Sequence, residues 1–377
     1  MNVIFTCGGT GGHINPAIAV ANLLKERHPD CNILFIGAKG HMEEKLVPKA
    51  GYELICLPGT GLSRKLSLQG IKTNCKAIAN VLSAIRQCKK IIRDFQPDMI
   101  VGTGGYASFP ALFAGSQMGI PTCVHESNAV PGLTTKMIAG RASKVLVSFA
   151  ESAAYYPKPD RVEVVGMPVR KEFITTRQQD ARRALGLDDR PVVVSAFGSL
   201  GARDMNIAIA DMFKLEHEGG YPYQHIHATG SFGWEWMPER VASLGVDVLE
   251  NKGIDMREYI YNMPEVMAAA DIIISRAGAS SCNEIGASGT PSILIPSPNV
   301  TNNHQEKNAR ILQERGAAIL LLEGDCSGQV LYNAVQQLVE DPDRRKAMSD
   351  AVRGMVILDS AERICDILEA LSAKKEK

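Results

Sequence analysis

The sequence predicts an α/β protein made of two Rossmann-like domains, each a doubly wound parallel sheet. At 377 residues the chain is longer than one hydrophobic core usually supports. Short runs rich in β-branched residues alternate with longer helical patterns almost from end to end, which is typical of right-handed βαβ units. Glycine-rich turns follow several of these runs, at the strand ends where open α/β sheets bind ligands.

The expected strands fall into two series with helical patterns between their members. The first series is Val3–Thr6, Ile33–Ile36, Met99–Val101, Thr122–Val124 and Val145–Val147. The second is Val192–Val194, Ile226–Ala228, Asp271–Ile274, Ser292–Ile295 and Ala318–Leu321. Between them a strand-like run over Val162–Val165 ends in glycine and proline, so we expect a hinge there. The predicted domains are 1–165 and 166–358, and 359–377 form a last helix and tail that could pack on either domain.

The composition excludes several other classes of protein. With 45% hydrophobic and 22% charged residues, the chain is globular and neither disordered nor fibrous. The 41 basic and 41 acidic residues cancel, so no overall field recruits nucleic acid. Nine scattered cysteines without a Cys-x-x-Cys pair are typical of reduced thiols. Because neither a signal-peptide pattern nor an apolar stretch of about 18 residues occurs, we expect a cytoplasmic protein that does not span a membrane.

The first glycine turn, Gly8–His13, directly follows the first expected strand and precedes a helix that Pro16 can start. Glycine lets a ligand approach the backbone amides, and a helix N-terminus favours negative charge, which suits a phosphate or a polar acceptor. A tight turn without a ligand is the alternative. A dinucleotide-binding oxidoreductase is disfavoured because the G-x-G-x-x-G spacing is absent, and the second strand ends at Ala38 without an acidic residue.

Further polar and glycine-rich turns follow other strands in both halves. They are Gly102–Tyr106, His125–Asn128, Phe197–Arg203 and Ser275–Ser281, the last leading into a helix that carries Glu284. Turns divided in this way predict a cleft in which a donor held by one domain faces an acceptor held by the other.

Seven segments, in order over nearly the whole chain, resemble the MurG family, bacterial transferases that move N-acetylglucosamine (GlcNAc) from UDP-GlcNAc to undecaprenyl-pyrophosphoryl-MurNAc-pentapeptide, or lipid I. The segments are Gly8–His13, Gly104–Tyr106, His125–Asn128, Pro168–Arg170, Gly198–Arg203, Ser275–Ala279 and Asn303–Ala309. The resemblance implies a GT-B fold, with the donor mainly in the C-terminal domain and the lipid acceptor mainly in the N-terminal one. It also implies inversion at the anomeric carbon, giving the β-1,4 linkage of lipid II.

The resemblance also implies roles for single residues. Those expected to contact UDP-GlcNAc are Thr10, Gly11, Gly12, Asn128, Arg170, Ser199, Ile260, Glu284 and Gln305. Arg170 and Ser199 would lie near the phosphates, Glu284 would accept from the ribose hydroxyls, and Ile260 would meet the uracil through its backbone. His13 is the candidate base for the MurNAc 4-hydroxyl, with Glu126 as the runner-up. No Asp-x-Asp of the metal-dependent glycosyltransferase type occurs and no His/Cys cluster has metal-ligand spacing, so we expect neither a metal nor a cofactor.

Simpler interpretations remain open at several of these positions. Glu284 could be a solvated helix residue, Arg170 a hinge ion pair, Gln305 an exposed helix start after the N-cap-like Asn302 and Asn303, and His13 a turn-orienting histidine. The sequence departs from the family at Phe197, where a glycine is usual, and at Leu200, where a polar residue is common. A bulky ring at 197 could narrow the phosphate-binding turn. Two other functions stay open, a different UDP-sugar glycolipid transferase and a non-catalytic nucleotide-sugar-binding regulator.

A basic stretch without acidic residues suggests contact with a membrane. Its basic residues are Arg64, Lys65, Lys72, Lys76, Arg86, Lys89, Lys90 and Arg93, interleaved with Ile78, Leu82, Ile85 and Ile92. Such a patch suits anionic headgroups, so we expect a peripheral protein on the cytoplasmic face of the membrane, with other cell-wall synthesis proteins as further partners. The alternative is an ordinary amphipathic helix with a basic solvent face.

Overall fold

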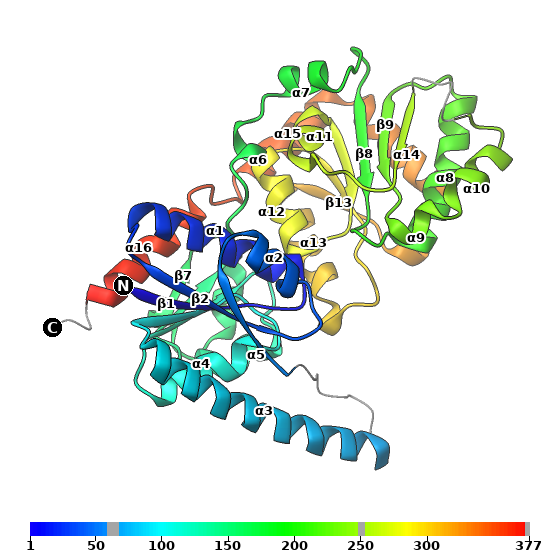
Figure 1. Cartoon of the computed structure of the whole chain (residues 1–377). Coiled ribbons are helices and arrows are strands. Elements are labelled where there is room, and N and C mark those ends of the chain that lie inside the picture. Colours follow the sequence, from blue (N-terminus) through cyan, green and yellow to red (C-terminus); the bar gives the residue numbers. More distant parts are fainter. Residues whose placement is uncertain (59–67, 248–252, 374–377) are drawn as a thin grey trace. The chain divides into compact units, whose positions relative to one another are not determined.

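The computed structural model describes residues 1–58, 68–247 and 253–373, with the side chains of 68–78 left out (Figure 1). It contains two compact units, Met1–Val169 with Ile357–Lys377, and Arg170–Val356. Each unit has one sheet, in the strand orders β3-β2-β1-β4-β5-β6-β7 and β10-β9-β8-β11-β12-β13. Every strand pair is parallel. The predicted α/β class with two doubly wound parallel sheets is therefore confirmed.

The N-terminal unit buries both faces of its sheet under helices. Its strands are β1 (Asn2–Thr6), β2 (Asn32–Ala38), β3 (Glu53–Leu57), β4 (Met99–Gly102), β5 (Thr122–Glu126), β6 (Lys144–Val147) and β7 (Val162–Val164). Its helices are α1 (Gly11–Arg27), α2 (Glu43–Lys49), α3 (Leu68–Phe95), α4 (Ser108–Gln117), α5 (Leu133–Ala139) and α16 (Ser360–Ala373), with 3-10 turns η1 (Ala150–Tyr155) and η2 (Pro159–Arg161). Along β1, Val3 and Phe5 enter one core and Ile4 the other.

The C-terminal unit repeats this layered plan. Its strands are β8 (Val192–Ala196), β9 (Gln224–Ala228), β10 (Ile254–Arg257), β11 (Ile272–Ser275), β12 (Ser292–Leu294) and β13 (Ala318–Leu320). Its helices are α6 (Glu172–Thr175), α7 (Gln178–Ala184), α8 (Arg203–Glu218), α9 (Ser231–Trp234), α10 (Met237–Ser243), α11 (Met263–Ala269), α12 (Ala279–Ser288), α13 (His304–Glu314), α14 (Gly328–Val339) and α15 (Pro342–Arg353). The 3-10 turns are η3 (Thr301–Asn303) and η4 (Glu323–Asp325).

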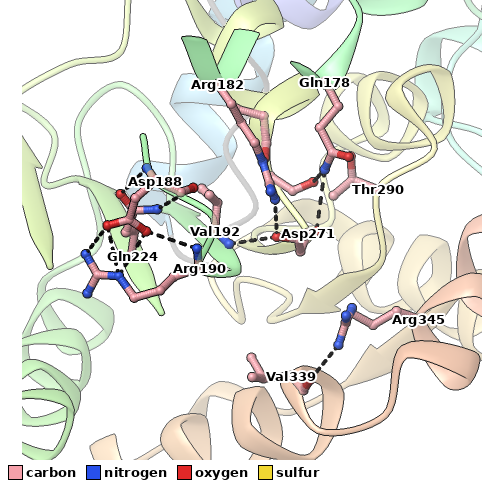
Figure 2. A network of polar contacts seen from close by, with 12 residues as sticks. Gln178, Arg182, Asp188, Arg190, Val192, Gln224, Asp271, Thr290, Val339 and Arg345 are labelled. Atoms are coloured by element: carbon pink, nitrogen blue, oxygen red, sulfur yellow. Dashed lines mark hydrogen bonds and ion pairs between the residues drawn. The ribbon is translucent and has the colours of Figure 1, made fainter. Parts of the chain in front are cut away.

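Asp271 anchors the N-terminal ends of two neighbouring strands of this second sheet (Figure 2). Its carboxylate accepts a hydrogen bond from the Val192 amide at 2.7 Å and pairs with the guanidinium of Arg182 on α7. Arg182 also donates from Nε to the Ala269 carbonyl at 3.1 Å. These contacts fasten α7 to the edge of the sheet opposite the glycine turns, so they serve the stability of the unit.

The last helix, α16, belongs to the first unit although the chain has passed through the second. Ile364, Cys365 and Leu368 enter the core that α1 forms with the first sheet. Arg27 at the end of α1 pairs with Asp366 at 2.6 Å. Figure 1 shows α16, in red, beside α1. The packing of this helix, which the sequence left open, is therefore on the N-terminal unit.

Candidate functional site

The first glycine turn closes around a buried acid, Glu43, that the sequence analysis did not single out. Glu43 is fully buried, and its carboxylate accepts from the amides of Gly9 and Ala38, both at 3.0 Å. A Cβ at Gly8 would lie 2.5 Å from its Oε1. Because a carboxylate already accepts from the Gly9 amide of the first turn, this turn is a poor phosphate cradle. The local sequence did not single out Glu43, because its partners lie after β1 and at the end of β2.

The second glycine turn seats the ring of His13. Gly104 has φ +114°, and a Cβ there would lie 2.5 Å from His13 Nδ1. Gly105 approaches the first turn just as closely, since its Cβ would lie 2.3 Å from the Gly8 carbonyl oxygen. Thr103 Oγ1 donates to the His13 carbonyl at 2.6 Å. The turns after β1 and β4 therefore interlock, which requires glycine at both contact points.

One hydrogen bond fixes the tautomer of His13. Its Nδ1 lies 2.9 Å from the carbonyl oxygen of Thr103. A carbonyl oxygen only accepts, so Nδ1 carries the proton and donates. The lone pair of the neutral imidazole is then on Nε2, where a general base needs it. His13 thus has the protonation pattern of a base, oriented by the backbone of a neighbouring strand end.

Glu126 shapes the loop that follows β5. Its side chain is 4% exposed. Oε1 accepts from the Asn128 backbone amide at 3.0 Å and from Asn128 Nδ2 at 3.1 Å, and Oε2 accepts from the Gly132 amide at 2.9 Å. Both oxygens are thus engaged in holding the loop and the side chain of Asn128. This bonding favours a positioning role for Glu126 over that of a base.

The burial of His125 excludes it from a direct role in the reaction. It is 2% exposed, and its Nε2 donates to the Gly166 carbonyl at 2.8 Å. Burial lowers its pKa below the ordinary histidine value, so the ring is neutral near pH 7. The hydrogen bond connects β5 to the chain segment that follows β7, which is a structural role.

The turn after β8 presents Ser199 on the surface and hides the ring of Phe197. Phe197 is 4% exposed and packs in the core of the unit, with its ring 6.2 Å from that of His227. Leu200 is 56% exposed. The expectation that a ring at 197 could narrow the turn is therefore wrong, because the strand pleat directs that side chain into the core. Gly198 and Gly201 have φ of +92° and +80°, which gives this turn its shape.

Glu284 is a half-buried carboxylate on α12 whose protonation is perturbed. Burial raises its pKa to about 7, and the positive charge of Arg170 partly opposes this. Among the described residues no hydrogen bond reaches its oxygens. Arg170 is exposed, and its guanidinium lies 5.1 Å from the centre of the Phe173 ring. A carboxylate kept partly desolvated without a partner is typical of a ligand site.

Ile260 and Gln305 lie in two further loops of this unit. Ile260 is 3% exposed and anchors the loop between β10 and α11, in which Tyr261 is 86% exposed. Gln305 Oε1 accepts from the Ser297 amide at 2.9 Å, which leaves its NH2 group to donate. Before it, Asn302 and Asn303 have φ of +57° and +52°, and Asn303 makes no side-chain cap. Asparagine commonly adopts this left-handed conformation, and the missing side-chain cap at Asn303 does not support simple capping.

The predicted residues therefore gather in each unit at the carboxyl ends of parallel strands. Thr10, Gly11, Gly12 and His13 follow β1, and Glu126 and Asn128 end or follow β5. In the other unit Ser199 follows β8, Ile260 follows β10, Glu284 lies after β11 and Gln305 after β12.

Arg276 in the fourth turn instead pairs with Glu323 and donates to the Ile295 carbonyl at 3.1 Å, so it braces the turn. Among the described residues no group of His, Cys, Asp or Glu could hold a metal ion.

The basic helix differs from its prediction. Arg64 and Lys65 lie outside the described residues, as do the side chains of Lys72, Lys76 and Ile78. Ile85 and Ile92, at 9% and 2% exposure, pack in the core, so they cannot belong to a membrane-facing surface. Leu82 is 52% exposed, and Arg86, Lys90 and Arg93 are exposed. None of the described helices is both long and apolar enough to cross a membrane.

Comparison with known proteins gives consistent matches over the whole chain. Residues 3–147 match the glycosyltransferase family 28 N-terminal domain, and residues 192–364 match its C-terminal domain. The UDP-N-acetylglucosamine--N-acetylmuramyl-(pentapeptide) pyrophosphoryl-undecaprenol N-acetylglucosamine transferase of Acetivibrio thermocellus is 37% identical, covering 100% of this chain and 99% of that protein. The enzyme of the same name from a Thermoanaerobacter species is 39% identical, covering 99% of this chain and 100% of its own length.

Solved structures agree in fold. The crystal structure of Acinetobacter baumannii MurG is 25% identical and has a TM-score of 0.77, covering 98% of this chain and 99% of its own. A UDP-GlcNAc 2-epimerase from Neisseria meningitidis, bound to UDP-GlcNAc, has a TM-score of 0.65 at 16% identity, covering 98% of this chain and 100% of its own. The second likeness concerns the fold alone.

Proposed function

The chain belongs to the MurG family within glycosyltransferase family 28, and from this membership we propose that it transfers GlcNAc from UDP-GlcNAc to lipid I. The observation that carries the proposal is the identity of 37% and 39% over essentially full length to two transferases of this name. The reaction makes lipid II, a step of peptidoglycan biosynthesis. In chemical terms, the MurNAc 4-hydroxyl replaces UDP at the anomeric carbon of GlcNAc.

The donor would bind to the C-terminal unit, through Arg170, Ser199, Ile260, Glu284 and Gln305. A guanidinium and turn amides suit the diphosphate, and a carboxylate suits the two ribose hydroxyls. The raised pKa of Glu284 and the exposure of Arg170 and Ser199 support this assignment. The charge that develops on departing UDP would be met by Arg170 and the helix-start amides of the turn after β8.

The acceptor would bind to the N-terminal unit, where His13 acts as the base. Its Nε2 would take the proton of the MurNAc 4-hydroxyl while the oxygen attacks the anomeric carbon from the side opposite UDP. One displacement of this kind inverts the α-linkage of the donor to a β-linkage. Thr10, Gly11, Gly12 and Asn128 would contact the donor from this side. The tautomer set by the Thr103 carbonyl supports His13, and the engaged carboxylate of Glu126 supports a positioning role for that residue.

The lipid acceptor requires that the protein reach a membrane surface, and we place this contact on α3. Arg86, Lys90 and Arg93 are exposed there, and no acidic residue interrupts the sequence between Arg64 and Arg93. Basic side chains near an anionic surface contribute about 1 kcal/mol each. The protein would then act as a peripheral protein at the cytoplasmic face of the membrane, beside other proteins of cell-wall synthesis.

Incubation of the purified chain with radiolabelled UDP-GlcNAc and a lipid I analogue tests the function. We expect label to enter the lipid fraction, with release of UDP in equal amount. Label that stays with UDP-GlcNAc, although the donor binds, would leave a nucleotide-sugar-binding protein without transferase activity. Transfer to another glycolipid but not to the lipid I analogue would contradict the acceptor assignment.

A further inference from the structure

A chain of four polar side chains lies completely inside the C-terminal unit, on α8 and the neighbouring strands β8 and β9. Glu216, His225, Ser195 and His227 are each 0% exposed. Glu216 Oε1 lies 2.7 Å from His225 Nδ1, and Ser195 Oγ lies 2.7 Å from both His225 Nε2 and His227 Nδ1. The order carboxylate, imidazole, hydroxyl is that of a hydrolytic triad. No substrate can reach a fully buried Ser195, so this relay does another task.

The carboxylate sets the direction of the hydrogen bonds in this relay. Glu216 can only accept, so His225 donates to it from Nδ1, as does the hydroxyl of Tyr223 at 3.2 Å. In a neutral His225 ring Nε2 then accepts the Ser195 proton, and Ser195 in turn accepts from Nδ1–H of His227. Each bond orients the next one, and the relay holds the side chains of β8 and β9 in one arrangement.

The relay connects the ends of the two strands that carry the interlocked turns of this unit. Ser195 and His227 are register partners on β8 and β9. A few residues further along each strand, Gly201 and Gly230 pack so closely that a Cβ on Gly201 would lie 2.0 Å from the Thr229 carbonyl oxygen. The centre of the Phe197 ring lies 6.2 Å from that of the His227 ring and 5.7 Å from Cζ of Arg276. The orientation of the His227 ring is thus passed to the start of the turn that bears Ser199.

Stability alone does not account for these polar groups. Glu216 Oε2 and His227 Nε2 have no hydrogen-bond partner among the described residues, and such buried atoms cost free energy. The ring of Phe213, a member of the apolar core, lies 5.0 Å from the ring of His225 and 5.9 Å from that of His227. Replacing both partners of a buried hydrogen bond by apolar groups of similar shape is often neutral or stabilising. The relay is therefore retained at a cost, beside a turn whose geometry matters for binding.

We propose that Glu216, His225, Ser195 and His227 are positioning residues, which hold the turn Gly198–Ala202 in the shape that binds the donor diphosphate. The inference rests on the proposed function, in which this turn meets UDP-GlcNAc. The relay touches neither substrate and acts through Phe197 and the strand ends. The relay also explains how the chain accommodates Phe197, at a position where a glycine is usual, since the Phe197 ring packs on His227.

The test compares Ser195→Ala with Ser292→Ala in the full-length chain. Ser292 on β12 is a matched control, because it is also fully buried and its Oγ has no partner among the described residues. KM for UDP-GlcNAc, kcat and the free energy of unfolding are measured for both. We expect KM to rise about tenfold in Ser195→Ala and kcat to fall as well, because the turn after β8 meets the diphosphate both on binding and as UDP departs. Ser292→Ala keeps the KM of the unchanged chain.

Glu216→Gln is the second variant, in case Ser195→Ala does not fold. It keeps the shape and one acceptor oxygen but removes the charge that orders the relay, and we expect KM to rise severalfold. An unchanged KM in folded Ser195→Ala or in Glu216→Gln, whatever the loss of stability, would overturn the proposal and leave a structural role. Failure of the proposed function would show differently, because the unchanged chain itself would then transfer no GlcNAc.

Discussion

At the scale of single residues, the tautomer of His13 leads to a direct prediction. His13→Ala should lower kcat by about 10²- to 10⁴-fold, the usual contribution of a general base. The affinity for UDP-GlcNAc should change little, because the diphosphate and ribose contacts lie on other residues. Single-turnover transfer and calorimetry measure the two quantities. His28→Ala, which removes an exposed histidine at the end of α1, is the control and should keep full activity. Parallel loss of affinity and turnover would count against the base assignment.

Glu284 makes donor binding depend on pH. Its pKa of about 7 lies above the ordinary glutamate value, so the carboxylate forms only as pH rises through 7. If the ribose requires the ionised form, the affinity for UDP-GlcNAc rises between about pH 6 and pH 8. Glu284→Gln should remove this dependence and weaken binding about tenfold at the higher pH. Calorimetry across this range checks both, with the exposed Glu314→Gln as control. A pH dependence that persists in Glu284→Gln would contradict the role.

The same pKa predicts the effect of Glu284 on stability. Since the pKa is raised on folding, protonation stabilises the fold, and this contribution is lost as pH rises from about 4.5 towards 7. Above pH 7 the wild-type chain therefore carries a cost that Glu284→Gln lacks. A variant that is more stable but binds the donor less well would mark Glu284 as kept for function. Denaturant unfolding at acid and alkaline pH measures the difference.

Residue identities on the candidate site could be predicted, but their surroundings could not. The sequence singled out His13 and Glu126 by type and place, yet their hydrogen bonds come from Thr103 and from the loop 128–132. Glu43 escaped notice because its partners are backbone amides, which leave no mark in the sequence. The doubt about Phe197 arose because sequence does not show on which side of a turn a ring packs.

At the scale of elements, the interlocked turns after β1 and β4 predict a specific glycine requirement. In Gly104→Ala the new Cβ would overlap the His13 ring and move it, so transfer should fall as far as in His13→Ala. Gly119→Ala is a matched control, since Gly119 also has positive φ, +76°, but nothing lies within 4 Å of its Cβ position. In both variants an alanine must adopt a positive φ, which lowers the free energy of unfolding by about 1 kcal/mol. Equal transferase activity of the two variants would contradict the inference that Gly104 holds the His13 ring in place.

The helix α3 predicts a charge-dependent contact with membranes. Changing Arg86, Lys90 and Arg93 together to glutamate should remove about 1 kcal/mol per side chain of binding to anionic vesicles, and leave binding to neutral ones unchanged. Sedimentation with vesicles of both kinds measures this. The control changes the exposed Lys45 and Lys49 of α2 to glutamate. Unchanged sedimentation of the α3 variant would leave α3 as an ordinary helix with a basic solvent face.

Two strands were absent from the sequence prediction, β3 and β10, and both lie at a sheet edge. An edge strand has one hydrogen-bonded neighbour and buries less of its side chains, so its sequence need not be apolar. Asp255 and Arg257 in β10 and Glu53 in β3 show this. The central strands were predictable because parallel strands covered on both faces read as β-branched runs.

At the scale of the whole molecule, the return of the chain to its first unit leads to a stability prediction. Leu368 of α16 is fully buried against that unit, so Leu368→Ala should lower its free energy of unfolding by about 2–5 kcal/mol. Leu358→Ala, at 48% exposure, is the control and should have little effect. Unfolding with and without saturating UDP distinguishes the units, because UDP stabilises the unit that binds it. If Leu368→Ala lowered only the stability of the unfolding transition that UDP protects, α16 would not belong to the N-terminal unit.

The sequence by itself determined the α/β class, the two parallel sheets, the positions of most strands along the chain and the resemblance to the family. These follow from patterns repeated along the chain, namely β-branched runs, helical spacing and glycine turns, each of which is local. Only the tertiary structure decided that α16 packs on α1, that Glu43 fills the first turn, that Gly104 seats His13 and that Ile85 and Ile92 face the core. Each of these depends on contacts between segments far apart in sequence, and such contacts depend on shape and burial, which no local pattern encodes.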